Sequence, residues 1–150
     1  MKIPELFRSG KTVFSFEIFP PKKDGSIETV YNTLDGLSDL RPDFISVTFG
    51  AGGSAAGAST SEIAGLIKRK YNTESIAHLT CVNMTKDEID RQIEDFREQG
   101  IENVLALRGD INPEIPPKKD FLHASDLISY MKERSDLSFS GACYPEGHVE

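Results

Sequence analysis

The sequence has little that would favour binding to nucleic acid or to a membrane. Lysine and arginine number 17 against 24 aspartates and glutamates, so the 150 residues carry a formal net charge of −7. Broad nucleic-acid or anionic-membrane surfaces need clustered basic side chains, and neither partner is expected. No apolar run approaches the roughly 20 residues of a membrane span. The opening MKIPELFRSGK also lacks the apolar core of a secretory signal, so a cytoplasmic protein is expected.

Cysteine is scarce as well. Cys81 and Cys143 both lie in apolar stretches, and neither a CxxC motif nor a Cys/His spacing occurs. The sequence therefore offers no metal motif, and two buried free thiols are expected in preference to a disulfide.

What the sequence does contain is an alternation of strand-like and helix-like segments. The predicted helices are marked by an N-cap at Ser26, a capping box from Thr85 to Glu88 and a stop at Gly100. The predicted strands cover residues 12–19, 43–49, 75–81, 103–109 and 138–144, and the helices 26–40, 59–72, 85–100 and 124–135. Such spacing indicates βαβ units with parallel strands, an α/β fold.

Two architectures fit five such units. A flavodoxin-like doubly wound sheet would be complete in this length, whereas a (β/α)8 barrel of the TIM type needs about 250 residues and would be incomplete. The strands favour the barrel, because one set of alternate residues is apolar and the other is small or polar. The apolar set, expected to face outer helices, is Phe14, Phe16, Ile18, Ile45, Val47, Ala77, Leu79, Leu105 and Leu107.

Glu17 is the most unusual residue of the first strand. It lies in the run TVFSFEIF just before Pro20-Pro21, on the polar set of residues that would face inward. Burial at the mouth of a barrel would raise the pKa of such a carboxyl and suit it to general-acid catalysis. The alternative is a structural carboxylate paired with Arg108 or His78.

Other polar residues end the following strands. TFGAGGS after the second strand is either a ligand-binding loop or a plain turn, and it is neither a dinucleotide fingerprint nor a Walker loop. His78 is either functional or an interior histidine. In LRGD, Arg108 could hold a phosphate and Asp110 a heterocycle, or the two could form a surface turn. Tyr144 could stack on a ring or cap the core. The lysine clusters that include Lys68 and Lys118 are interpreted as solvated.

Five motifs together resemble the methylenetetrahydrofolate reductase family: FSFEIFPPK, ISVTFGAGGS, HLTCVNMT, NVLALRGD and ACYPEGH, in this order over essentially the whole chain. The resemblance implies a flavoprotein of one-carbon metabolism and methionine biosynthesis with a (β/α)8 barrel. It implies FAD as cofactor and NADH or NADPH as electron donor. The implied reaction reduces 5,10-methylenetetrahydrofolate to 5-methyltetrahydrofolate; homo-oligomerisation stays open.

The resemblance also assigns roles to single residues. Glu17 matches the general acid that protonates the bridged folate, and Asp110 matches the residue that binds the pterin and tunes the flavin. The other positions match contacts to flavin or nicotinamide; they are Thr48, Phe49, Ala51, His78, Arg108, Gly109, Asp110, Ala124, Tyr144 and His148.

One departure from the family concerns length. The last three βα units and a folate-holding glutamine have no counterpart in these 150 residues, so the chain is expected to be the N-terminal part of a single reductase barrel. A non-catalytic, five-stranded flavin- or nucleotide-binding module is the alternative, and a structural fragment that binds no flavin is a third reading.

Overall fold

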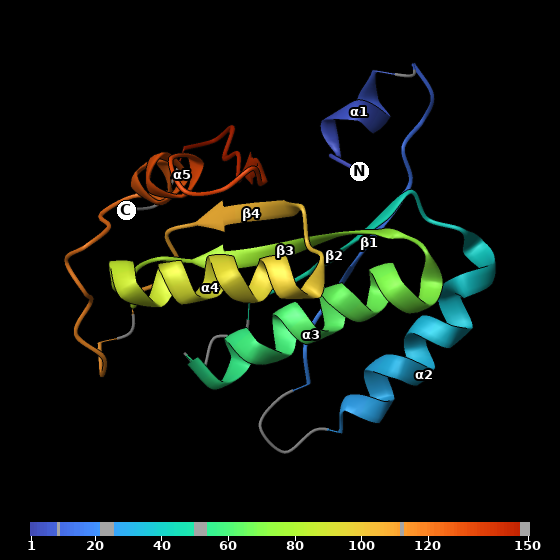
Figure 1. Cartoon of the computed structure of the whole chain (residues 1–150), viewed down its shortest axis with the longest axis horizontal. Helices are drawn as coiled ribbons and strands as arrows, with labels where there is room; N and C mark the ends of the chain where they lie inside the picture. The colour runs from blue at the N-terminus through green and yellow to red at the C-terminus, as the bar shows by residue number, and fades with distance from the viewer. Residues whose placement is uncertain (9, 22–25, 50–53, 112, 148–150) are drawn as a thin grey trace.

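Five parallel strands form one sheet in the order in which they occur along the chain (Figure 1). The computed structural model describes residues 1–8, 10–21, 26–49, 54–111 and 113–147, with the backbone alone for 54–59. The strands are β1 Ser15–Ile18, β2 Phe44–Val47, β3 Glu74–Thr80, β4 Asn103–Leu107 and β5 Ser138–Gly141. A doubly wound sheet reverses its strand order at a switch point, whereas a barrel adds strands consecutively. The order β1-β2-β3-β4-β5 therefore contradicts the flavodoxin-like alternative and agrees with a partial barrel.

Helices connect successive strands: α2 Ile27–Leu37, α3 Ser54–Tyr71, α4 Lys86–Gln99 and α5 Ala124–Lys132, with α1 Pro4–Phe7 preceding β1 and a 3₁₀ turn, η1 Ser38–Leu40, after α2. The predicted caps are confirmed. Ser26 Oγ accepts from Glu28 N at 3.1 Å, Thr85 and Glu88 form the reciprocal capping box of α4, and Gly100 ends α4 in the left-handed conformation. Each cap satisfies main-chain groups that a helix end leaves free.

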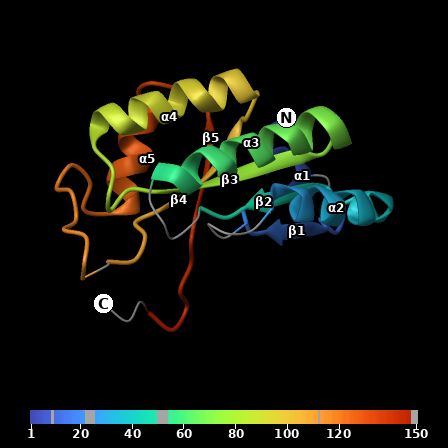
Figure 2. The same cartoon turned by 90° about the horizontal axis from the view of Figure 1, so that it is seen from below.

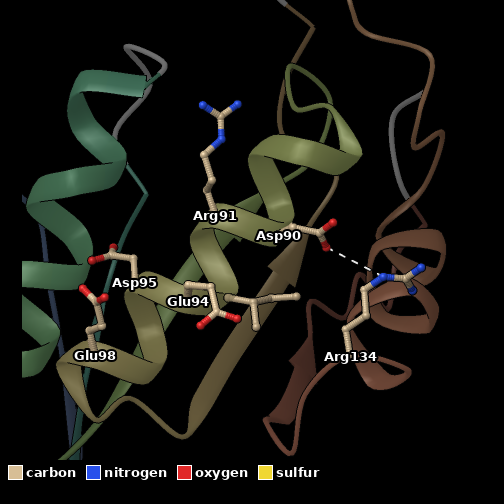
Figure 3. A pocket seen from close by; sticks show the side chains of 7 residues that line it. Asp90, Arg91, Glu94, Asp95, Glu98 and Arg134 are labelled. Carbon is tan, nitrogen blue, oxygen red and sulfur yellow. Dashed lines mark ion pairs between the residues drawn. The ribbon is translucent and has the colours of Figure 1, made fainter.

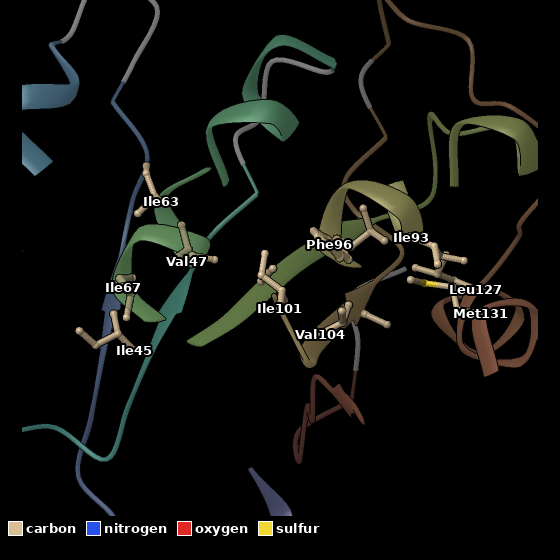
Figure 4. Packing of buried hydrophobic residues seen from close by; sticks show 14 of the residues in the cluster. Ile45, Val47, Ile63, Ile67, Ile93, Phe96, Ile101, Val104, Leu127 and Met131 are labelled. Carbon is tan, nitrogen blue, oxygen red and sulfur yellow. The ribbon is translucent and has the colours of Figure 1, made fainter. Parts of the chain in front are cut away.

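The connecting helices α2, α3, α4 and α5 pack on the same face of the sheet, where the apolar core lies (Figures 2 and 4). The sheet contributes Ile18, Ile45, Val47, Ala77, Leu79, Val104 and Ala106 to this core, and the helices contribute Val30, Leu34, Ile63, Ile67, Ile89, Ile93, Phe96, Leu127 and Met131. Because side chains alternate across a strand, the opposite face carries the other set of residues.

The prediction for the fourth strand was wrong. Val104 and Ala106 face the helices and are fully buried, while Leu105 and Leu107 lie half-buried on the opposite face. The pairing decides this, since β3 places Ala77 beside Val104 and His78 beside Leu105. Both sets of β4 are apolar, so alternation alone could not show which one meets the helices.

The amino ends of the strands are tied to the start of the chain. Asn103, buried at the first position of β4, accepts from Ile3 N at 2.8 Å and donates to Met1 O at 3.1 Å and Ser75 O at 3.3 Å. Lys68 Nζ lies 3.0 Å from Glu74 and 2.6 Å from Glu102, which corrects the interpretation of Lys68 as solvated. These contacts lie at the amino ends of the strands, opposite the carboxyl ends at which parallel α/β barrels place their sites.

Within the described part of the chain, no helix is both long and apolar enough to cross a membrane.

Candidate active site

Three polar side chains from neighbouring strands meet on the sheet face away from the helices. Glu17 lies on β1, Ser46 stands directly opposite it on β2, and His78 lies late on β3. Ser46 Oγ donates to Glu17 Oε2 at 3.3 Å, and His78 Nε2 lies 3.5 Å from the same oxygen. Residues from three separate βα units are thus placed in contact by the parallel register of the sheet.

His78 is buried, with 6% of its surface exposed. Burial lowers the pKa of its imidazole, and the negative charge of Glu17 partly opposes that effect. The Nε2 atom has no hydrogen-bond partner among the described residues, and its ion-pair contact to Glu17 is at the long end of the range. Burial thus favours the neutral form of the imidazole, which faces the carboxyl group of Glu17.

The expected burial of Glu17 is contradicted. Its side chain is 50% exposed, because β1 lies at the edge of the described sheet and no described element covers the face on which Glu17 stands. The alternative that paired Glu17 with His78 is confirmed as a contact. The exposure of Glu17 is compatible with a role as a general acid, since such an acid must be reachable by its substrate.

The end of β2 brings Thr48 and Phe49 to the same edge of the sheet. Thr48 N donates to Ile18 O at 3.0 Å, and Thr48 O accepts from Thr60 Oγ1 on α3 at 2.9 Å. Thr48 and Phe49 are half-buried, and Phe49 packs against the core. Ala51 lies outside the described residues.

Gly109 makes a tight turn directly after β4. Its φ is +85°, and a Cβ added there would lie 2.9 Å from Thr80 Cβ and 3.2 Å from Val82 Cγ1. Arg108 O accepts from Cys81 N at 3.1 Å and Val82 N at 2.8 Å, so this turn lies against the end of β3. Only glycine meets both demands, which gives the RGD motif a structural reason at its central position.

The flanking residues of this turn are polar and accessible. Arg108 is half-buried and its Nε donates to Gly109 O at 3.1 Å, while Asp110 is exposed. The prediction that both residues lie at the carboxyl edge is confirmed, and their contacts with a phosphate or a heterocycle stay predictions.

The segment after this turn is held by α4. Lys118 N donates to Val82 O at 2.9 Å, and Lys118 Nζ lies 2.7 and 2.6 Å from the two carboxylate oxygens of Glu88. This ion pair, with the backbone hydrogen bond from Thr85, lowers the pKa of Glu88 to about 2. Lys118 is thus paired, and its interpretation as a solvated lysine was wrong.

Residues near the end of the chain are more exposed than expected. Tyr144 follows β5 and is 56% exposed, so it does not form the predicted cap of the core. Both cysteines are free, but Cys143 is exposed and only Cys81 is buried, which corrects one of the two thiol predictions. Burial raises the pKa of the Cys81 thiol to about 11. Ala124 is the first residue of α5, and His148 lies outside the described residues.

Ser46 is the site residue to which sequence reasoning gave no role. Its place in the polar set of β2, two residues before Thr48, put it on the correct face. Its contact with Glu17 depends on the β1–β2 register, which aligns the two residues.

A separate hollow lies on the outer surface of the helix layer (Figure 3). This groove of about 540 Å³ runs between α4 and α5 and is lined by Asp90, Arg91, Ile93, Glu94, Asp95, Glu98 and Arg134. Arg134 Nε lies 3.7 Å from Asp90 Oδ1 across it. The helices separate this groove from the face that carries Glu17, so it is not part of the candidate site.

Comparison with known proteins finds relatives over nearly the whole chain. The family model described as methylenetetrahydrofolate reductase matches residues 2–150. The 5,10-methylenetetrahydrofolate reductases of Salmonella typhimurium and Escherichia coli are each 40% identical over 141 residues, which is 94% of this chain and 47% of theirs. Methylenetetrahydrofolate reductase (NADH) 1 of Arabidopsis thaliana is 39% identical over 160 residues, covering 99% of this chain and 26% of its own. The chain thus spans about half the length of these bacterial relatives.

Proposed function

The chain belongs to the methylenetetrahydrofolate reductase family, and from this premise we propose that it takes part in reducing 5,10-methylenetetrahydrofolate to 5-methyltetrahydrofolate. FAD is the proposed cofactor, and NADH or NADPH the proposed electron donor. The observation that carries the proposal is the cluster of Glu17, Ser46 and His78 on the sheet face opposite the helices. The names of the relatives supply the substrate, and the NADH in the Arabidopsis name supports a nicotinamide donor.

The residues at the carboxyl edge fit a flavin. A planar ring with a phosphate chain needs an apolar surface, hydroxyl or main-chain groups, and a cation. The open face offers Leu105 and Leu107, the end of β2 offers Thr48, and the turn after β4 offers Arg108 beside a glycine. When bound, the flavin would pass a hydride from the nicotinamide to the folate. The proposed contacts are Thr48, Phe49, Ala51, His78, Arg108, Gly109, Asp110, Ala124, Tyr144 and His148.

Glu17 is the proposed general acid. A carboxyl that is reachable and anchored on one oxygen can give its proton to the bridged folate, which promotes opening of the bridge. Asp110, exposed beside the glycine turn, is proposed to accept hydrogen bonds from the pterin. Both residues are at the carboxyl edge of the sheet, where parallel α/β folds place their sites.

We further propose that the five βα units correspond to the first five of an eight-unit barrel. The consecutive strand order supports this, and so does the share of the bacterial relatives that the chain covers. The proposed barrel would enclose the face that carries Glu17.

Titration of the purified chain with FAD, followed by its visible spectrum, tests the function. Anaerobic NADH or NADPH should bleach bound flavin, and methylenetetrahydrofolate should restore the colour. Flavin that binds without bleaching would support the non-catalytic module instead, and no flavin binding would contradict both.

Replacement of Glu17 separates the two half-reactions. Glu17→Gln should slow reoxidation by methylenetetrahydrofolate at least about 100-fold, the usual contribution of general acid catalysis, and leave bleaching by the nicotinamide unchanged. Stopped-flow measurement of each step checks this, with Glu98→Gln on the outer groove as the control. Equal slowing of both steps would make Glu17 a structural residue.

A further inference from the structure

The hydroxyl of Ser46 forms hydrogen bonds with both the main chain and a side chain of β1. Its hydroxyl lies 3.4 Å from Phe16 O and 3.3 Å from Glu17 Oε2. The residue is 8% exposed, so its position is set by the sheet. A single hydroxyl proton is shared between these two acceptors, which joins the carboxylate to the backbone that carries it.

Two polar contacts of the Glu17 carboxylate fall on the same oxygen. Ser46 Oγ and His78 Nε2 both approach Oε2, at 3.3 and 3.5 Å. Among the described residues, neither of these two contacts falls on Oε1, which leaves that oxygen available to a ligand. An anchored Oε2 fixes the direction in which Oε1 presents a proton, and correct direction is a large part of catalysis by a positioned acid.

We propose that Ser46 is a positioning residue that anchors Oε2 of Glu17 and so directs Oε1 toward the bound folate. The inference rests on the proposed function for its chemical meaning, but the anchoring itself is a property of these residues alone. No atom of Ser46 takes part in the proton transfer. A side chain that is half exposed, as that of Glu17 is, would otherwise sample several rotamers.

The pKa of His78 can be used to test whether Ser46 keeps the Glu17 carboxylate in place. Glu17 is the charged group whose field raises the pKa of His78, against the lowering by burial. In the sheet, His78 stands beside the uncharged Leu105 on β4, and the β2 residues paired with the preceding part of β3, Ser46 beside Ile76 and Val47 beside Ala77, are uncharged as well. The pKa of His78 therefore reports how close the Glu17 carboxylate stays.

The first experiment follows the imidazole signals of His78 by NMR against pH, with no flavin or folate present. Glu17→Gln should lower the pKa of His78, because a negative charge is lost. Ser46→Ala should lower it in the same direction without reaching the Glu17→Gln value, since the carboxylate moves away but remains. Ser46→Thr, which keeps a hydroxyl, should restore the original value.

Two further variants separate anchoring from general packing. Ser75→Ala removes a buried hydroxyl that has no hydrogen-bond partner among the described residues and lies on the helix-facing side of β3, so it should leave the pKa of His78 unchanged. Ser46→Ala combined with Glu17→Gln should match Glu17→Gln alone, because Ser46 acts through Glu17. The anchoring is overturned if Ser46→Ala leaves the pKa of His78 unchanged. It is also overturned if Ser46→Ala shifts this pKa by the same amount whether or not Glu17→Gln is present.

The second experiment uses the flavin-loaded chain. Ser46→Ala should slow reoxidation by methylenetetrahydrofolate about 3- to 30-fold and leave bleaching by NADH unchanged, a loss smaller than that from Glu17→Gln. If the unsubstituted chain is not bleached, the proposed function fails while the NMR result on the anchor stands. If bleaching and reoxidation occur but Ser46→Ala slows neither, the positioning role is overturned.

Discussion

At the scale of single residues, Gly109 shows how one position can set the shape of the candidate site. Its positive φ and its close approach to Thr80 are separate demands, and both follow from the turn that brings Arg108 and Asp110 to the sheet edge. A left-handed conformation alone costs an ordinary residue about 1–2 kcal/mol. The close contact of a new Cβ at position 109 with the Cβ of Thr80 adds the cost of overpacking.

Gly109→Ala should therefore lower the free energy of unfolding by about 2 kcal/mol or more. Gly100→Ala is the matched control, because Gly100 also has a positive φ, +72°, but a Cβ there would meet nothing within 4 Å. We expect it to cost about 1 kcal/mol. Urea denaturation of the two variants checks this, and equal losses would mean that the contact with Thr80 and Val82 contributes nothing.

At the scale of elements, α4 does more than cover the sheet. Its capping residue Glu88 also binds Lys118, and Lys118 N is bonded to Val82 O at the end of β3. Asp120 Oδ2 accepts from Lys86 N at 2.9 Å as well. The start of one helix thereby holds the long connection between β4 and α5, which follows the RGD turn.

Glu88→Gln should lower the free energy of unfolding by about 1 kcal/mol at pH 7, through the weakened cap and the lost ion pair. The folded-state pKa of about 2 lies below the ordinary 4.5, so the carboxylate stabilises the fold above pH 4.5. That contribution fades as the pH falls toward 2. The difference between the two proteins should shrink over the same range.

Denaturation at several pH values measures this difference. The control is Glu94→Gln on the same helix, whose ion pair with Arg97 is exposed on both sides. Exposed pairs are worth little, so a loss below about 0.5 kcal/mol is expected. Hydrogen exchange at Lys118 N should also speed up in Glu88→Gln alone, and protection that is unchanged would contradict the role of this pair in holding the connection.

At the scale of the whole molecule, hydrogen bonds hold the start of the described chain against the amino ends of the strands, whereas the carboxyl ends are accessible. Asn103 joins the first residues of the chain to β3 and β4, over separations of 100 and 102 residues. The opposite, carboxyl end carries the polar side chains of the candidate site. Stability and proposed function are thus separated along the strand direction, as in barrel enzymes.

Asn103→Ala should lower the free energy of unfolding by about 1–3 kcal/mol, because it leaves Ile3 N and the carbonyls of Met1 and Ser75 without this partner. Asn32→Ala, at an exposed position of α2, should change it by less than about 0.5 kcal/mol. Thermal and urea unfolding measure both variants. A neutral Asn103→Ala would show that these three hydrogen bonds contribute nothing to the stability of the fold.

Much of the fold could be predicted because its signals are local. The helix ends at Ser26, Thr85 and Gly100 depend on hydrogen bonds within a few residues, and the structure confirms them. The alternation also indicated the correct faces for Phe16 and Ile18 in β1 and for β2, but Phe14, expected to face the helices, is 47% exposed just before β1. It failed in β4, where Val104, Leu105, Ala106 and Leu107 are all apolar and pairing with β3 decides the orientation.

By itself, the sequence determined the repeat of strands and helices, the caps, the motifs that identify the family, and the polar residues placed late in successive strands. Only the tertiary structure decided that the strands add consecutively, that Ser46 and His78 meet one oxygen of Glu17, and that Glu17 is half exposed. The physical reason is how far apart along the chain the interacting residues lie. Caps and alternation arise from neighbours along the chain, whereas register, contact and exposure depend on residues that only the folded sheet brings together.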